Sequence, residues 1–241
     1  MSDESHVDQL IRQAESCLDK GDLPQARRLY TEICRARDDD AHAWLMFGAI
    51  NGELGNVEVA QGAIERAVAL DPEYAEAHLA LAHLLKARAQ FAQALAAALQ
   101  AVAADAELVE GWLFVAATAG QLADWSRAEE ACHHVIELAP GRLEGHVNLG
   151  NVLLATGRAL QAEETFREAL ALGENAEASF GLGLALSALD RHADAEPALA
   201  SALRLDVSNA VFREALANCL EHLGRSDESA AVRAGSTSSQ G

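Results

Sequence analysis

The side chains that could do chemistry are scattered histidines and cysteines, and their spacing does not suit a catalytic or metal site. His133 and His134 are adjacent, so on a helix they point about 100° apart and cannot bind one ion together. His78 and His83 are five residues apart, which is also a poor spacing for one metal. No nucleophile–base signature, phosphate loop or metal motif accompanies them. We therefore expect no catalytic residue, no cofactor and no metal, and a chain that is not an enzyme.

The element that must carry any function is a helical hairpin, seen best in residues 143–175. Val147, Leu149 and Leu153 recur at helical spacing in the first half, and Phe166 belongs to a similar pattern in the second half. Gly157 lies between the two halves, where a glycine just past a helix end takes the left-handed conformation without a Cβ penalty. A hairpin this short cannot cover its own apolar stripes, so it predicts an array in which neighbours cover each other.

The same hairpin recurs along the chain with a period of about 34 residues. The repeats are 7–40, 41–74, 75–108, 109–142, 143–175, 176–209 and 210–233. A small residue recurs in the first helix at Ala14, Gly48, Ala82, Ala116, Gly150, Gly183 and Ala217. A second small residue recurs in the second helix at Ala26, Ala60, Ala94, Ala128, Ala162 and Ala195. The turn column reads Gly21, Gly55, Ala89, Ala123, Gly157, Asp190 and Gly224.

Composition limits the partners and the compartment. The formal net charge of −19 repels phosphate backbones and anionic lipids, so nucleic-acid and membrane-surface binding are disfavoured. No apolar run reaches the ~18 residues needed to span a bilayer, which predicts no membrane insertion. The first ten residues are acidic and lack a secretory signal. The cysteines have no disulfide-type spacing and suit a reducing compartment: Cys17, Cys34, Cys132 and Cys219. We expect a cytoplasmic protein.

These columns resemble the tetratricopeptide repeat family, with repeat 41–74 as the best match through Trp44, Phe47, Gly48, Gly55, Ala60, Ala67 and Pro72. The resemblance implies an all-α, right-handed α-solenoid of stacked antiparallel helix hairpins, with about six full repeats and a C-terminal capping helix. We expect the solenoid over 7–233, a flexible N-terminus at 1–6 and a disordered tail at 234–241. His78 shares the column of Trp44 and should be a packing residue, and Cys132 should be a buried thiol.

The resemblance also implies a concave groove that binds a peptide or protein, lined by the second, fifth, ninth and twelfth positions of each first helix. The second position supplies carboxylates at Glu76, Glu110, Glu144 and Glu177. The fifth position supplies apolar side chains at Leu45, Leu79, Leu113, Val147 and Phe180. The ninth and twelfth positions supply His83, Lys86, Asn151, Leu184, Ser187 and Asn218, and Asn148 lies beside them at the sixth. An apolar strip bordered by carboxylates predicts a partner with apolar anchors and Lys or Arg, although the glutamates would also suit the helix dipole with no ligand.

Three functions follow from this pattern. The first is a non-enzymatic scaffold or adaptor that binds a peptide or protein segment in its groove. The second is the recognition arm of an enzyme, of glycosyl- or sulfotransferase type, whose catalytic domain lies elsewhere. The third is a structural scaffold that assembles with itself, because repeat solenoids can pack groove to convex face.

Overall fold

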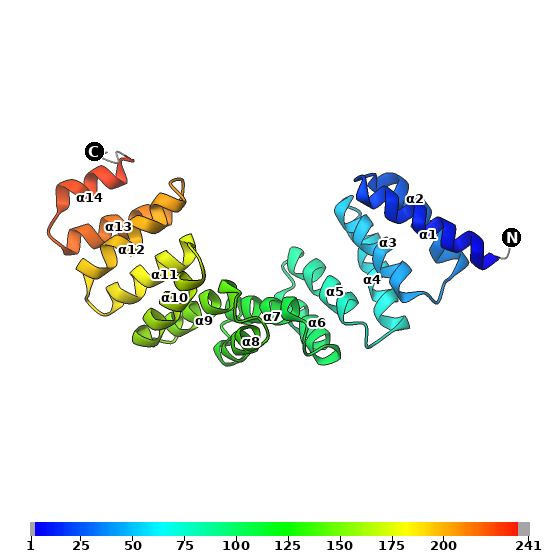
Figure 1. Ribbon diagram of the computed structural model, residues 1–241, viewed down its shortest axis with the longest axis horizontal. Helices are drawn as coiled ribbons and strands as arrows, with labels where there is room; N and C mark the ends of the chain where they lie inside the picture. The colour runs from blue at the N-terminus through cyan, green and yellow to red at the C-terminus, as the bar shows by residue number, and fades with distance from the viewer. Residues whose placement is uncertain (1–2, 236–241) are drawn as a thin grey trace. The chain divides into compact units, whose positions relative to one another are not determined.

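The computed structural model describes residues 3–235, with side chains from residue 5 onward, and all regular secondary structure in that range is helical (Figure 1). The chain divides into two compact units, Met1–Thr118 and Ala119–Gly241. The boundary falls inside one helix, so each unit is described separately. The all-α fold class predicted from the sequence is confirmed.

The first unit is built from antiparallel pairs joined by short turns, drawn in blue through green in Figure 1. Its helices are α1 (Asp3–Asp19), α2 (Leu23–Ala36), α3 (Ala41–Glu53), α4 (Val57–Leu70), α5 (Ala75–Ala87) and α6 (Phe91–Ala104), followed by α7 (Val109–Gln121), which crosses the unit boundary. Helices α1 and α2, α3 and α4, and α5 and α6 pack against each other as hairpins.

The second unit continues the same pattern. Its helices are α8 (Trp125–Leu138), α9 (Leu143–Ala155), α10 (Ala159–Leu172), α11 (Ala176–Ala188), α12 (His192–Leu205), α13 (Ala210–His222) and α14 (Ser226–Arg233). Helices α9 and α10, α11 and α12, and α13 and α14 form hairpins, and each hairpin packs on the next through α10 against α11 and α12 against α13. The predicted stacking of hairpins is therefore present within each unit.

The columns of small residues are where the helices approach most closely. All six second-helix alanines are completely buried: Ala26, Ala60, Ala94, Ala128, Ala162 and Ala195. In the first helices, a Cβ built on Gly150 would lie 2.6 Å from the Phe166 ring, and one built on Gly48 would lie 2.6 Å from the Ile64 side chain. A larger side chain in either column would therefore separate the helices, which explains why small residues recur there.

The turn column adopts the left-handed conformation in every repeat, with or without glycine. Gly157 has φ +78°, and the non-glycine residues Ala89, Ala123 and Asp190 have φ values of 58°, 58° and 59°. A Cβ in this region is strained, because it approaches the following carbonyl oxygen. The hairpin geometry is therefore retained at three turns in spite of a local cost.

A second repeated feature fixes the entry to the first helices. The indole Nε1 of Trp44 donates to the Asp38 carbonyl at 3.0 Å, and that of Trp112 donates to the Ala106 carbonyl at 2.9 Å. In the same column His78 is only 8% exposed, and its Nε2 lies 2.9 Å from the Pro72 carbonyl oxygen. His78 therefore replaces the tryptophan as a packing residue, as the sequence predicts.

The ends of the chain differ from the sequence prediction. Helix α1 begins at Asp3, so residues 3–6 form helix rather than the expected flexible segment. At the other end, α14 completes a seventh hairpin, and this short helix covers α13, which the sequence assigned as the cap. The predicted disordered tail lies outside the described residues from 236 onward, and Ala234 and Gly235 follow α14 as a turn.

Candidate functional site

The second-position glutamates lie in the first turn of four first helices, α5, α7, α9 and α11. Glu76, Glu110, Glu144 and Glu177 are all exposed to solvent. Hydrogen bonding to its own backbone N–H, and then to Arg142 at 3.4 Å, lowers the pKa of Glu144. A carboxylate at a helix N-terminus is also favoured by the dipole. All four carboxyl groups are therefore accessible to a ligand.

The fifth-position residues pack more deeply than the sequence suggested. Val147 is 3% exposed and Leu45 is 8% exposed, so both belong to the hydrophobic core and offer little surface to a ligand. Leu79, Leu113 and Phe180 are half-buried. A ligand can therefore contact the apolar strip at these three half-buried positions, but not at the two buried ones.

Within the first unit, the ninth and twelfth positions of α5 meet α7. The His83 ring lies edge-on to the Phe114 ring, with centroids 4.7 Å apart. The Lys86 ammonium lies 5.2 Å from the centroid of the same ring, which is a cation–π geometry. Burial, and then the positive charge of Lys86, lowers the pKa of His83. The structure thus brings together His83 and Lys86, with Phe114 as a partner that the sequence had not assigned to the groove.

Within the second unit, the corresponding positions of α11 open onto a cleft of about 340 Å³ between α11, α13 and the start of α12. Leu184 and Ser187 of α11 face Asn218 of α13 across it. The rings of His192 and His222 stack with centroids 4.3 Å apart and form part of the lining. The cleft combines apolar walls with polar groups that can donate or accept hydrogen bonds, which suits a peptide side chain.

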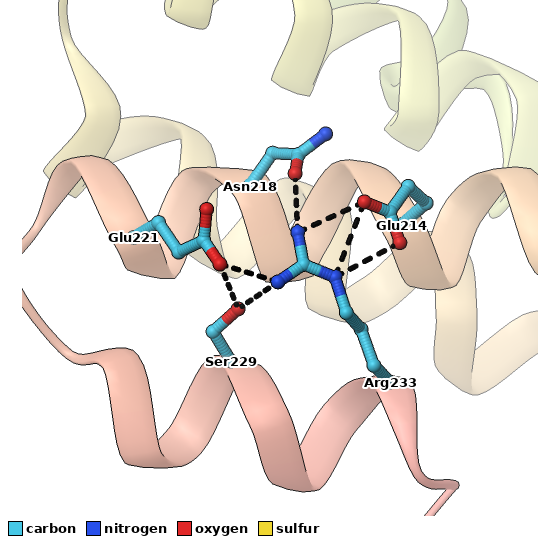
Figure 2. Close-up of polar contacts among 5 residues, drawn as sticks. All are labelled: Glu214, Asn218, Glu221, Ser229 and Arg233. Carbon is cyan, nitrogen blue, oxygen red and sulfur yellow. Dashed lines mark hydrogen bonds and ion pairs between the residues drawn. The ribbon is translucent and has the colours of Figure 1, made fainter.

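Asn218 also belongs to a second set of contacts, at the end of α14. Figure 2 shows the Arg233 guanidinium between Glu214, Asn218 and Glu221 of α13, beside Ser229 of its own helix. Arg233 donates to Glu214 at 2.9 and 3.0 Å and to the Asn218 carbonyl oxygen at 2.6 Å, and it also pairs with Glu221. Its hydrogen bonds lower the pKa of both glutamates. The Asn218 side chain, which the sequence assigned to peptide binding, thus already holds an internal partner.

The remaining predicted groove residues lie on α9. Asn151 is exposed and Asn148 is half-buried, so both present amide groups at the surface.

His133 of α8 is exposed, and its Nε2 lies 4.0 Å from Glu129. Cys132 is completely buried, as predicted, and burial raises the pKa of its thiol to about 12.

A ladder of ion pairs that was not predicted from the sequence joins the second helices of the second unit. Arg158 pairs with Glu129 at 2.7 Å, and Arg191 pairs with Glu163 at 2.8 Å. A third pair, Arg225 with Glu196 at 2.6 Å, repeats the arrangement. Each arginine directly follows a turn-column residue, and each glutamate directly follows a small-column alanine of the preceding repeat. The spacing was therefore visible in the same columns that define the repeat.

Two other kinds of site are absent from the described part of the chain. No three His, Cys, Asp or Glu side chains among residues 5–235 gather closely enough to hold a metal ion. None of the helices over 3–235 has the length and apolar character needed to cross a membrane.

Sequence comparison identifies the repeats. Two family models described as tetratricopeptide repeat match residues 147–204 and 180–235, and residues 41–74. The type IV pilus assembly protein PilF of Pseudomonas aeruginosa is 30% identical over 149 residues, which represent 58% of this chain. The match spans 57% of the length of that relative.

Solved structures share the fold at low sequence identity. The structure titled as a functional characterisation of Pseudomonas aeruginosa pilF has a TM-score of 0.74 at 15% identity, and covers 90% of this chain and 100% of that one. YrrB, described as a TPR protein with an unusual peptide-binding site, has a TM-score of 0.67 at 17% identity, covering 76% and 95%. MamA has a TM-score of 0.63 at 20% identity, covering 69% and 91%.

Proposed function

Because this chain belongs to the tetratricopeptide repeat family, we propose that it is a non-enzymatic scaffold that binds a segment of another protein along the first helices of its hairpins. The observation that carries the proposal is the ladder of exposed glutamates in the first turns of α5, α7, α9 and α11. Small and aliphatic residues bury the hairpins against each other, so these polar first-helix positions are not needed for packing.

The partner segment carries Lys or Arg together with apolar anchors. Glu76 and Glu110 supply the negative charge in the first unit, and Glu144 and Glu177 supply it in the second. Half-buried apolar side chains lie one helical turn away at Leu79, Leu113 and Phe180. Charge complementarity of this kind sets the choice of partner and the association rate.

The setting of this scaffold is the assembly of a multisubunit complex in the cytoplasm. PilF, the relative that matches over part of its length, is a type IV pilus assembly protein. All four cysteines are free, and three of them are buried, which suits a reducing compartment. Fractionation of the source cell, with immunodetection of this chain, tests the compartment separately from the partner.

Selection from a displayed random peptide library tests the binding proposal. We expect the selected peptides to share Lys or Arg next to Leu, Ile or Phe, and to bind the purified chain in fluorescence anisotropy. The double substitution Glu110→Lys and Glu144→Lys should weaken binding about tenfold, because each change replaces an attraction by a repulsion and tenfold corresponds to about 1.4 kcal/mol.

The matched control reverses two exposed glutamates on second helices, Glu58 in the first turn of α4 and Glu130 on α8. It changes the net charge by the same amount and should leave affinity unchanged. Selection of acidic or purely apolar peptides would contradict the proposed partner chemistry. Equal losses in the two double variants would show that net charge, and not the first-helix ladder, is responsible.

A further inference from the structure

Side-chain contacts at two junctions show how neighbouring first helices meet. Position 5 of one helix faces position 3 of the next, as in the contact of the Phe180 and Phe212 rings at 4.7 Å. Positions 9 and 12 face position 6, as His83 and Lys86 do with Phe114. Each first helix therefore has a leading face at positions 3 and 6 and a trailing face at positions 5, 9 and 12.

The trailing face of α13 differs in chemistry from those before it. Its positions 5, 9 and 12 are Glu214, Asn218 and Glu221, whereas position 5 is apolar in all six preceding repeats. All three side chains hold the Arg233 guanidinium (Figure 2). This face is thus built to accept an arginine, and an arginine of the same chain already occupies it.

Arg233 stands where a following first helix would enter. It occupies the same repeat column as Phe166, whose ring reaches the first helix of the next hairpin, where a Cβ on Gly181 would lie 2.2 Å away. Position 6 of an incoming helix and Arg233 would therefore compete for the same space.

The leading face of α1 has the complementary chemistry. Its positions 3 and 6 are Gln9 and Arg12, and they border a shallow cleft of about 420 Å³ that also includes Ser16 and Lys20. Two cations line this cleft and no carboxylate does. Arg12 and Lys20 are exposed, and neither forms an ion pair with a carboxylate of residues 5–235. In a chain of net charge −19, a cleft lined by two cations and no carboxylate is unusual.

We infer that the leading face of α1 docks on the trailing face of α13 of a second copy of this chain, with Arg12 taking the place of Arg233 between Glu214, Asn218 and Glu221. Arg12 is at position 6 of its repeat, which is the position that meets residues 9 and 12 where α5 contacts α7. The contact is head-to-tail, so it leaves a free face at each end and extends into a chain of molecules or a ring.

Arg233 regulates this docking because it competes within the same molecule. Its carboxylate partners are about half exposed, with relative side-chain exposures of 54% for Glu214 and 49% for Glu221. Exposed ion pairs of this kind stabilise little, so the exchange of Arg233 for Arg12 costs little. The intramolecular arginine nevertheless has the advantage of a high effective concentration, which keeps the wild-type chain largely unassembled when dilute.

Sedimentation velocity of the full chain tests the inference over a series of protein concentrations at low ionic strength. We expect Arg233→Gln to associate at least tenfold more tightly than the wild type, and 0.5 M salt (about 4 Å of Debye screening) to suppress the association. Arg233→Lys keeps the charge with fewer hydrogen bonds and should fall between the two. Circular dichroism confirms that α14 remains helical in each variant.

Charge reversal identifies the contact. Adding Arg12→Glu to Arg233→Gln should return the chain to a monomer, whereas the matched change Arg28→Glu, at an exposed site on α2, should not. Adding Glu221→Arg to the chain that carries both Arg233→Gln and Arg12→Glu should restore association. Monomeric behaviour of folded Arg233→Gln and Arg233→Lys at every concentration would overturn the inference, and so would association that persists in the presence of Arg12→Glu.

Discussion

The substitution Gly181→Ala probes how tightly consecutive hairpins pack. A Cβ at residue 181 of α11 would lie 2.2, 2.4 and 2.7 Å from three carbons of the Phe166 ring. Phe166 is completely buried, and Gly150 also lies close to it, because a Cβ there would lie 2.6 Å from the same ring. A completely buried ring that contacts two glycines has little room to move away from an added methyl group.

The magnitude follows from two opposing terms. Overpacking a full core costs about 1–3 kcal/mol, and the rigid ring places this site toward the upper end. Alanine in a helix interior recovers about 1 kcal/mol relative to glycine. We expect a net destabilisation of about 2 kcal/mol, which for a chain of this length is roughly 4–8 °C in melting temperature.

Urea denaturation followed by circular dichroism measures this loss. The control is Gly62→Ala on α4, where an added Cβ meets no atom within 4 Å and the propensity gain of about 0.5–1 kcal/mol should appear as a stabilisation. Combining Gly181→Ala with Phe166→Leu should cost less than the sum of the two single changes, because the smaller side chain relieves the clash. A Gly181→Ala chain as stable as the wild type would refute the packing argument.

Three further predictions concern the turn, the ion-pair ladder and a histidine. Ala89→Gly should increase the free energy of unfolding by about 0.5–1 kcal/mol and raise the melting temperature, because residue 89 has φ 58° and glycine removes the strain there. Arg191→Gln should lower the melting temperature more than Arg204→Gln does. The partner of Arg191, Glu163, is only 5% exposed, whereas the partner of Arg204, Glu174, is largely exposed. A double-mutant cycle with Glu163→Gln checks the pairing. The pKa of His83 is lowered in the folded chain, so below the ordinary value of 6.5 the unfolded chain binds a proton that the folded chain does not. The stability of the folded chain should therefore fall from pH 7.5 to pH 5.5. His83→Gln should show a smaller fall in melting temperature over the same pH range.

The sequence predicted the backbone of each hairpin because one physical requirement recurs in every repeat. Where two helices cross closely only a small residue fits, so Ala60 and Gly150 lie in columns that can be recognised without a structure. The turn column was equally informative, and Ala123 shows why, since it adopts the left-handed conformation that glycine has in most other repeats. Steric requirements of this kind depend on neighbours that are close in sequence.

The surface was harder to predict, because exposure depends on residues from the next hairpin. Val147 and Phe180 share one position of the repeat, yet Val147 is buried and Phe180 is half-buried. The prediction of an apolar strip treated these positions as equivalent. Periodicity identifies which face a residue lies on, but the size of its neighbours in the adjacent hairpin decides how much of it a ligand can reach.

The same limit explains why the role of Arg233 required a structure. Its column is occupied by Tyr30, Ile64 and Phe166 in earlier repeats, so an arginine there departs from the repeat pattern. In the structure the long side chain continues past the core position and reaches carboxylates on α13 that have replaced apolar groups. The two departures from the pattern compensate each other, since neither an arginine facing leucine nor a glutamate facing leucine would be satisfied. A polar residue in a core column of a terminal repeat is thus best sought together with a matching change on the helix that it covers.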